Sequence, residues 1–276
     1  MVAGYIDYLK ADKKSERTIA TYTKYVQQML NFVCKDECDI TLADLNIWRN
    51  SLSHLSSASI ALEIKSIKNY FNYLIDMDII NQNPAVKLKA PVIKNREKEY
   101  VSESMVDSMI QCATNIRDKA ILLLLKKNGL RVNELINLTI DQYLFMKKYN
   151  QHYFKITGKG DKERNVYFTD ELIQMIDKYL SDRNDQCDRL FVSHWGGPIH
   201  SNNLSQTLKT IAKKANIPFW ENISNHYMRV ACATIYSEKG VPVSEIRDLL
   251  NHSNISVTNT YLKTNPDTIY DTVMLK

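Results

Sequence analysis

The sequence predicts a mainly α-helical protein of the α+β class, with one small β-hairpin and two domains. Three observations support this prediction. The 276 residues include only 7 Gly and 6 Pro, too few for a turn-rich all-β fold. Apolar residues recur at helical spacing along most of the chain. The spacing changes to a period of two in one stretch only, between residues 153 and 168.

The first ninety residues are predicted to form four amphipathic helices, which are enough to close a small bundle. A short helix at residues 5–9 precedes three longer ones, whose predicted N-caps are hydroxyl side chains: Ser15, Thr41, and Ser56 or Ser57. The dipeptide Asn83-Pro84 is expected to stop the last helix. This four-helix region, residues 1–90, forms the first predicted domain.

Residues 91–100 contain a run of charges and little to bury, so they are predicted to be a linker. The second predicted domain, residues 101–276, is helical apart from the hairpin, whose tip at 158–161 carries basic residues. Its helices are expected at residues 102–112, 117–127, 133–138, 171–180, 203–215, 225–239 and 244–250.

Composition narrows the class of protein. The net charge of +5 permits nucleic-acid binding without demanding it. Five scattered cysteines fit reduced thiols, and the Cys34-x3-Cys38 pair lacks the neighbours of a zinc site. No stretch approaches the roughly 18 apolar residues of a membrane span, and the charged first helix is unlike a signal peptide. We therefore expect a soluble cytoplasmic protein that binds no metal or other cofactor.

Six side chains with useful chemistry each have an ordinary structural explanation when taken singly: a surface ion pair, a solvated hairpin lysine, a capped helix, a structural histidine or a packed tyrosine. Their order along the chain makes them a set. They are Arg131, Lys159, His226, Arg229, His252 and Tyr261.

The sequence segments around these residues resemble the motifs of the tyrosine recombinase (phage integrase) family. Residues 128–135 look like its Gly-Leu-Arg-x-x-Glu-Leu box, and residues 158–164 are similar to its Gly-Lys-Gly-x-Lys-x-Arg hairpin. Residues 249–253, followed by Thr258-x-x-Tyr261, resemble its Leu-Leu-Gly-His ending. The likeness covers essentially the full length, and the layout is that of the Xer-type recombinases. The resemblance implies a core-binding domain of four helices followed by a catalytic domain.

The resemblance also implies the activity, a site-specific recombination of double-stranded DNA without metal or ATP. Tyr261 would attack a phosphodiester and form a 3′-phosphotyrosyl bond, while Lys159 would protonate the departing 5′-oxygen. The residue chemistry agrees, since Arg131 and Arg229 offer permanently charged forks to the phosphate oxygens. His226 and His252 can donate hydrogen bonds and move protons near neutral pH.

Other residues are predicted to support this chemistry. Glu134 is expected to brace the site by orienting Arg131 or His252. Lys162 and Arg164 on the hairpin are predicted to contact DNA phosphates. Lys126 and Lys127 are either further phosphate contacts or solvated charges at a helix end.

Three positions depart from the usual wording of the family. Asn225 stands where Pro often precedes the first His, and Val230 stands where many relatives have a second His. Asn251 replaces the Gly before His252, although Asn tolerates a left-handed turn. None of these departures removes a catalytic group.

The resemblance implies four protomers on two paired sites, with a nucleoid-associated location. One recombinase or two cooperating ones, with or without accessory factors, fit the sequence equally. Chromosome-dimer resolution and integration or excision of a mobile element are also equally compatible. The short amphipathic stretch after Tyr261 would pack on a neighbouring protomer or in cis. Two alternatives remain: a DNA-binding accessory protein that does not cut, and a topoisomerase of the same chemistry.

Overall fold

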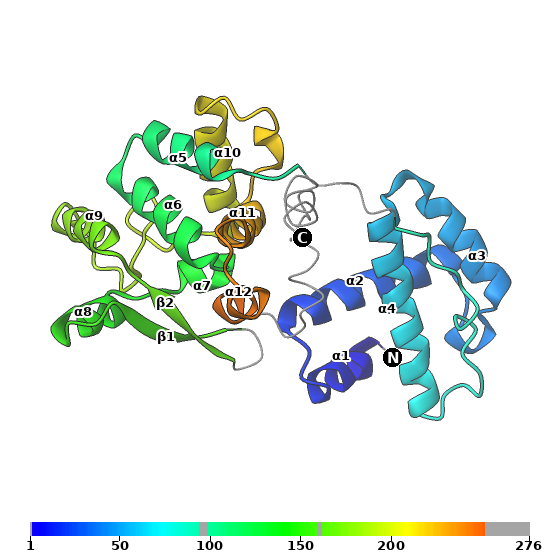
Figure 1. Cartoon of the computed structure of the whole chain (residues 1–276). Helices are drawn as coiled ribbons and strands as arrows, with labels where there is room; N and C mark the ends of the chain where they lie inside the picture. Colours follow the sequence, from blue (N-terminus) through cyan, green and yellow to red (C-terminus); the bar gives the residue numbers. More distant parts are fainter. Residues whose placement is uncertain (1, 94–98, 159–161, 252–276) are drawn as a thin grey trace. The chain divides into compact units, whose positions relative to one another are not determined.

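A computed structural model describes residues 2–93, 99–158 and 162–251. The chain divides into two compact units, Met1–Glu97 and Lys98–Lys276 (Figure 1). Most of the described residues are helical, and the strands among them form one two-stranded sheet. The predicted fold class, mainly α with one small hairpin, is therefore confirmed. No helix in these ranges combines the length and apolar character needed to span a membrane.

The first unit contains four α-helices and two short 3-10 turns among its described residues. They are α1 (Val2–Ala11), α2 (Glu16–Val33), η1 (Glu37–Asp39), α3 (Leu42–Ser51), η2 (Leu52–His54) and α4 (Ser57–Asp76).

The hydroxyl N-caps of the first unit are confirmed. The side chain of Ser15 accepts the backbone N–H of Thr18, and Ser56 rather than Ser57 caps α4. Thr41 forms a reciprocal capping box with Asp44. The prediction that Asn83-Pro84 stops the last helix is wrong. Helix α4 ends at Asp76, several residues earlier, because the chain turns through a left-handed residue at Asp78.

The core of the first unit is rich in tyrosine. Tyr5 of α1 packs edge-on against Tyr70 of α4, with ring centroids 5.0 Å apart, and it also contacts Tyr73. The buried hydroxyls have partners, since Tyr5 donates to Asn69 and Tyr70 donates to Glu37. These bonds give the polar end of each ring an acceptor, so the rings can be buried without an orphaned hydroxyl.

The second unit contains eight α-helices, a 3-10 turn and a hairpin among its described residues. They are α5 (Glu103–Cys112), α6 (Ile116–Asn128), α7 (Val132–Ile136), α8 (Ile140–Lys148), β1 (Tyr153–Thr157), β2 (Glu163–Tyr167), α9 (Asp170–Ser181), α10 (Ser201–Lys214), η3 (Trp220–Asn222), α11 (Asn225–Glu238) and α12 (Val243–Leu250).

Helix α6 is the centre of this unit. Every residue from Ala120 to Leu125 is buried, so the helix is apolar on all sides. It packs against α5, α9 and α11, which therefore surround it. The loop at its C-terminal end consequently lies among several other elements, where side chains far apart in the sequence can meet.

Helix α8 is the one α-helix among the described residues of this unit that the periodicity did not predict. Tyr143 and Met146 face the core, but Leu144 and Phe145 between them are exposed. Apolar residues therefore occur on both faces, which removes the amphipathic signal. The helix begins instead with a capping box between Thr139 and Gln142, and this local hydrogen bonding sets its start.

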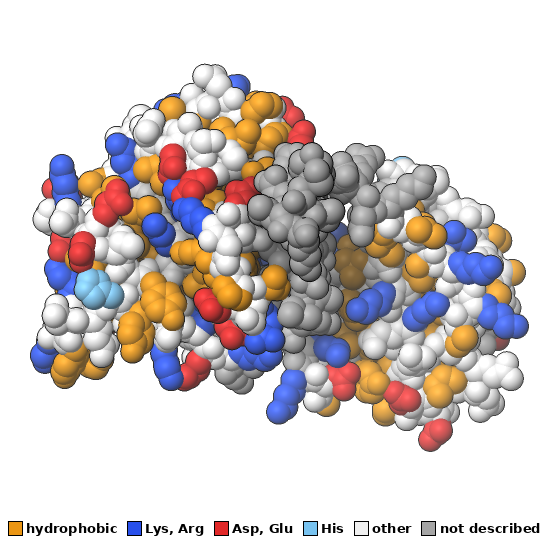
Figure 2. Space-filling model, in the orientation of Figure 1, with side chains coloured by type: hydrophobic (Ala, Val, Ile, Leu, Met, Phe, Trp, Pro, Cys, Tyr) orange, Lys and Arg blue, Asp and Glu red, His pale blue; other side chains and the backbone are white. Residues whose placement is uncertain are grey.

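The hairpin pairs β1 and β2 antiparallel, with Tyr153 opposite Tyr167 and Thr157 opposite Glu163. Side chains alternate strictly along β2, so Arg164 and Val166 point into the core while Glu163 and Tyr167 point out. Figure 2 shows both basic and acidic side chains on the visible face of each unit.

Candidate active site

The loop between α6 and α7 carries Arg131 and is tightly packed. Gly129 ends α6 as a left-handed C-cap with φ +53°. A Cβ at this position would lie 2.5 Å from a methyl of Leu250 and 3.1 Å from Sγ of Cys232. Glycine is thus needed both for its backbone conformation and for the close approach of α11 and α12.

Arg131 is held by the acidic residue one turn further along. Its backbone N–H donates to Oε2 of Glu134 at 2.9 Å, and its Nη1 donates to Oε1 at 2.7 Å. The Glu134 side chain is only 4% exposed, so this is no ordinary surface pair, whereas the Arg131 side chain remains 34% exposed. Glu134 therefore holds the Arg131 side chain while part of that side chain remains exposed to solvent. This geometry agrees with the expectation that Glu134 orients Arg131.

Arg229 reaches the same place from α11. Its guanidinium is buried, with Nη1 donating to the carbonyl of Gly129 at 2.6 Å and Nη2 donating to the carbonyl of Leu250. Arg131 donates from its Nη2 to the next carbonyl, that of Asn251, at 3.0 Å. Arg131 and Arg229, which are predicted to act together, thus donate to the consecutive carbonyls of Asn251 and Leu250 and lie close to each other.

Asn225, noted above only as a replacement for Pro, contributes to this assembly. It is the first residue of α11, and its Nδ2 donates to the carbonyl of Leu130 at 2.7 Å. Its Oδ1 is buried and has no hydrogen-bond partner among the described residues. The side chain ties the start of α11 to the residue before Arg131. A helix-initiating Asn was visible in the sequence, but its distant partner was not.

The structure does not support the predicted phosphate contact of Arg164. Its side chain is 2% exposed, and its Nη1 lies 3.2 Å from Oε2 of Glu134. Nη2 donates to the carbonyl of Asn128 at 2.6 Å. The guanidinium therefore binds protein groups inside the core. The period of two on β2 was the available signal, because it places residue 164 on the same face as Val166.

Lys126 is also engaged by protein groups. Its Nζ lies 2.6 Å from Asp107 and 2.9 Å from Glu103, and its side chain is 10% exposed. These two carboxylates offset its charge, which argues against the predicted phosphate contact. Lys127 is half-buried and Lys162 is exposed, and phosphate contact by either residue stays a prediction.

The base of the hairpin tip lies beside these residues. The carbonyl of Lys162 accepts the N–H of Gly158 at 2.8 Å and Nδ2 of Asn251 at 3.3 Å. A Cβ on Gly158 would be 3.2 Å from Oε1 of Glu134. Asn251 adopts the left-handed conformation expected of it, with φ +50°, and ends α12. Its side chain thus forms a contact to the hairpin that Gly could not form.

Three predicted catalytic residues lie outside the described part of the chain: Lys159, His252 and Tyr261. The structure describes the residues next to two of them, Gly158 and Asn251, and these lie beside Glu134 and Lys162. His226 is described and exposed, in the first turn of α11 and three residues before Arg229.

The carboxylate of Glu134, which pairs with both Arg131 and Arg164, is held in its charged form. Burial by itself would raise the pKa of Glu134. The Arg131 amide and the guanidiniums of Arg164 and Arg131 outweigh burial and keep this pKa below its usual value. The described residues contain no group of three His, Cys, Asp or Glu placed to hold a metal ion.

Comparison with known proteins shows which family models and relatives the chain matches. Residues 98–267 match the phage integrase family, and residues 2–81 match the phage integrase N-terminal SAM-like domain. Tyrosine recombinase XerA of Pyrococcus horikoshii is 34% identical over 263 residues, covering 94% of this chain and 87% of XerA. A tyrosine recombinase of Thermosipho africanus is 30% identical, covering 99% of this chain and 98% of the relative.

Solved structures agree. The crystal structure of XerA recombinase is 26% identical, with a TM-score of 0.57 over 99% of this chain and 96% of that one. A lambda integrase dimer bound to a COC′ core site has a TM-score of 0.75 at 16% identity, over 96% and 94% of the two chains, and shows the same fold.

The chain therefore belongs to the phage integrase family. Within that family it is a Xer-like tyrosine recombinase, an enzyme of site-specific recombination that cuts and rejoins DNA. The predicted family, fold class and enzyme class are confirmed. The non-cutting accessory protein and the topoisomerase find no support.

Proposed function

We propose that this enzyme exchanges strands between two double-stranded DNA sites through a covalent 3′-phosphotyrosyl intermediate, with Tyr261 as the nucleophile. The Tyr261 oxygen attacks phosphorus and passes its proton to His226 or His252, while the bond from phosphorus to the 5′-oxygen breaks. Lys159 supplies the proton that the departing 5′-oxygen needs. The phosphotyrosyl ester conserves the energy of the broken bond, so a 5′-hydroxyl of the partner strand reseals the DNA without ATP.

The geometry of the two arginines supports this proposal most strongly. Arg131 and Arg229 are fixed to the carbonyls of Asn251 and Leu250, immediately before His252. Cleavage concentrates negative charge on the non-bridging oxygens, and preorganised guanidiniums stabilise that charge without reorganising during the reaction. His226 stands in the first turn of α11, where backbone N–H groups add positive potential.

The buried contacts support a positioning role for other residues. Glu134 fixes one edge of the Arg131 guanidinium, and Arg164 fixes Glu134 from the hairpin side. Asn225 sets the start of α11, from which Arg229 projects. These three residues would act on the phosphate only through the arginines that they hold.

We further propose that four protomers assemble on paired sites and act on DNA of the nucleoid, alone or with a second recombinase or accessory factor. XerH, a structural relative, is described in a post-cleavage complex with palindromic difH DNA. Its TM-score of 0.70 at 17% identity reflects a shared fold, and its palindromic substrate supports the proposal that the present enzyme acts on a symmetric site.

A suicide-substrate assay tests the chemistry. A nicked duplex carrying a candidate site is incubated with the full-length enzyme, without metal or nucleotide and with a chelator present. Wild type is expected to form a protein–DNA adduct that survives denaturation, whereas Tyr261→Phe and Arg229→Ala are expected to form none. Tyr270→Phe is the matched control and should form the adduct normally. An adduct that persists in Tyr261→Phe would show that another residue is the nucleophile.

A further inference from the structure

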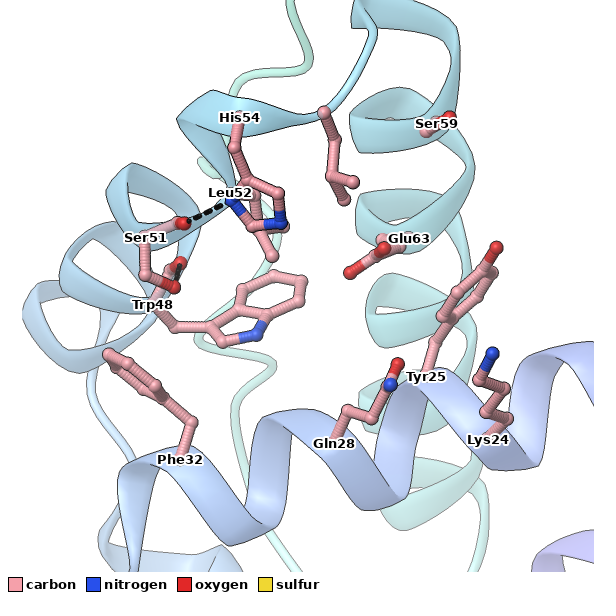
Figure 3. Close-up of a pocket in the computed structure, with 11 residues that line it drawn as sticks. Lys24, Tyr25, Gln28, Phe32, Trp48, Ser51, Leu52, His54, Ser59 and Glu63 are labelled. Atoms are coloured by element: carbon pink, nitrogen blue, oxygen red, sulfur yellow. Dashed lines mark hydrogen bonds between the residues drawn. The ribbon is translucent and has the colours of Figure 1, made fainter.

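A groove in the first unit holds a carboxylate that forms no hydrogen bond and no close ion pair with a described residue. The groove has a volume of about 420 Å³ and lies between α2, α4 and the α3–η2 segment (Figure 3). Glu63 of α4 is 5% exposed, and Figure 3 shows its carboxylate pointing into the groove. No hydrogen bond, and no ion pair within 4.0 Å, joins Glu63 to another described residue.

The nearest basic side chains, Lys24 and His54, form no close ion pair with Glu63. Lys24 and His54 line the groove, but both side chains are exposed and belong to its rim. His54 is fixed by its Nδ1, which lies 3.1 Å from the carbonyl of Ser51 and must donate to it, because a carbonyl only accepts. Burial raises the pKa of Glu63, and the opposing effects of Lys24 and His54 are smaller.

The remaining lining of the groove is largely apolar and aromatic. Trp48 and Leu52 are buried at its floor, and Tyr25 and Phe32 stand on α2 at its side. The Glu63 carboxylate opens into the groove and accepts no hydrogen bond from a described residue, so a cationic donor that enters the groove would find an acceptor there. A phosphate would be repelled, whereas a cation is attracted both by the carboxylate and by the aromatic faces.

We propose that this groove binds an organic cation, namely an ammonium or guanidinium group on an alkyl stem, with Glu63 as its counter-ion and Trp48 packing on the stem. The volume suits a group of this size. The same chemistry is carried by a free amine and by a Lys or Arg side chain of a second copy of the chain. The proposal does not depend on the catalytic roles proposed above, and it is tested without DNA.

Agmatine, an alkyl guanidinium, is the probe. The enzyme is labelled with ¹⁵N-tryptophan, and the indole N–H resonance of Trp48 is followed during titration. Saturable shifts at millimolar agmatine are expected in wild type. Glu63→Gln should raise the Kd about tenfold or more, Glu63→Asp should raise it less, and Glu16→Gln, which changes an exposed residue of α2, should leave it unchanged. Butylurea, a neutral compound with a similar stem, should not bind.

Sedimentation velocity separates the two sources. If the chain self-associates, and if both agmatine and Glu63→Gln abolish that association, the cation comes from a second copy of the chain. If neither agmatine nor Glu63→Gln changes the sedimentation coefficient, the cation is a free ligand. The absence of a saturable shift, or equal affinity in wild type and Glu63→Gln, would overturn the proposal. A loss of DNA affinity in Glu63→Gln without any agmatine response would also overturn it, and would make Glu63 an acceptor for a base amine.

Discussion

The guanidinium of Arg164 lies 3.2 Å from the carboxylate of Glu134, and this buried ion pair joins the β-hairpin to the loop that carries Arg131. Glu134 is thereby shared by two arginines, one inside the core and one at the surface. The pair links the hairpin to the loop that carries Arg131, for which phosphate binding is proposed above, so its loss should affect both stability and catalysis.

Replacing Arg164 with Ala should lower the free energy of unfolding by about 3 kcal/mol, because Glu134 would be left as a less compensated buried charge. Urea denaturation measures this change, and the suicide-substrate assay under folding conditions should show slower cleavage. Arg164→Lys keeps the charge but not the fork, so it should recover part of the stability. Lys155→Ala, which removes an exposed ion pair on the same hairpin, should cost less than about 0.5 kcal/mol. Equal effects of the two alanine variants would contradict the inferred role.

The pH dependence of stability should contain a contribution from Glu134. Its pKa is lower in the folded chain than the unperturbed value of 4.5. A depressed acid stabilises the fold above its unfolded pKa, and this stabilisation is lost as the pH falls below 4.5 toward the folded pKa. Wild type should therefore lose stability below pH 4.5 more steeply than Glu134→Gln in urea titrations across this range. Parallel curves would show that Glu134 has the same pKa in both states.

Gly129→Ala should be far more harmful than Gly240→Ala, although both glycines have positive φ. Both variants lose about 1–2 kcal/mol from left-handed backbone strain. At Gly129 the new methyl also meets Leu250 and Cys232, which adds about 1–3 kcal/mol of overpacking, whereas nothing lies within 4 Å at Gly240. Urea denaturation of the pair isolates the packing contribution, and a difference near zero would mean that the loop can move aside.

Asn251→Gly should leave global stability within about 0.5 kcal/mol of wild type, because Gly adopts the left-handed turn at least as easily as Asn. It removes the hydrogen bond from Nδ2 to the carbonyl of Lys162, which also accepts the N–H of Gly158. Hydrogen exchange at the Gly158 amide should therefore become faster, while exchange in α6 stays slow. Unchanged exchange at Gly158 would show that Asn251 does not restrain the hairpin.

Local rules predicted much of the fold. N-cap hydroxyls such as Ser15 and the period of two in the hairpin are set by hydrogen bonding and steric constraints within a few residues. Helix α8 escaped prediction because apolar Leu144 and Phe145 interrupt its amphipathic pattern. Only the packing around Tyr143 and Met146 shows which face of that helix belongs to the core.

The sequence by itself determined the family. The order and spacing of the six predicted catalytic residues, and the motifs around them, can be recognised without knowing which residues are in contact. The tertiary structure decided which basic residues are largely buried beside carboxylates and which keep an exposed face. Arg131 keeps an exposed face, whereas Arg164 and Lys126 are engaged by carboxylates. A charge in the sequence does not show whether its counter-charge comes from the substrate or from the chain, since partners such as Glu134 and Asp107 are supplied by folding.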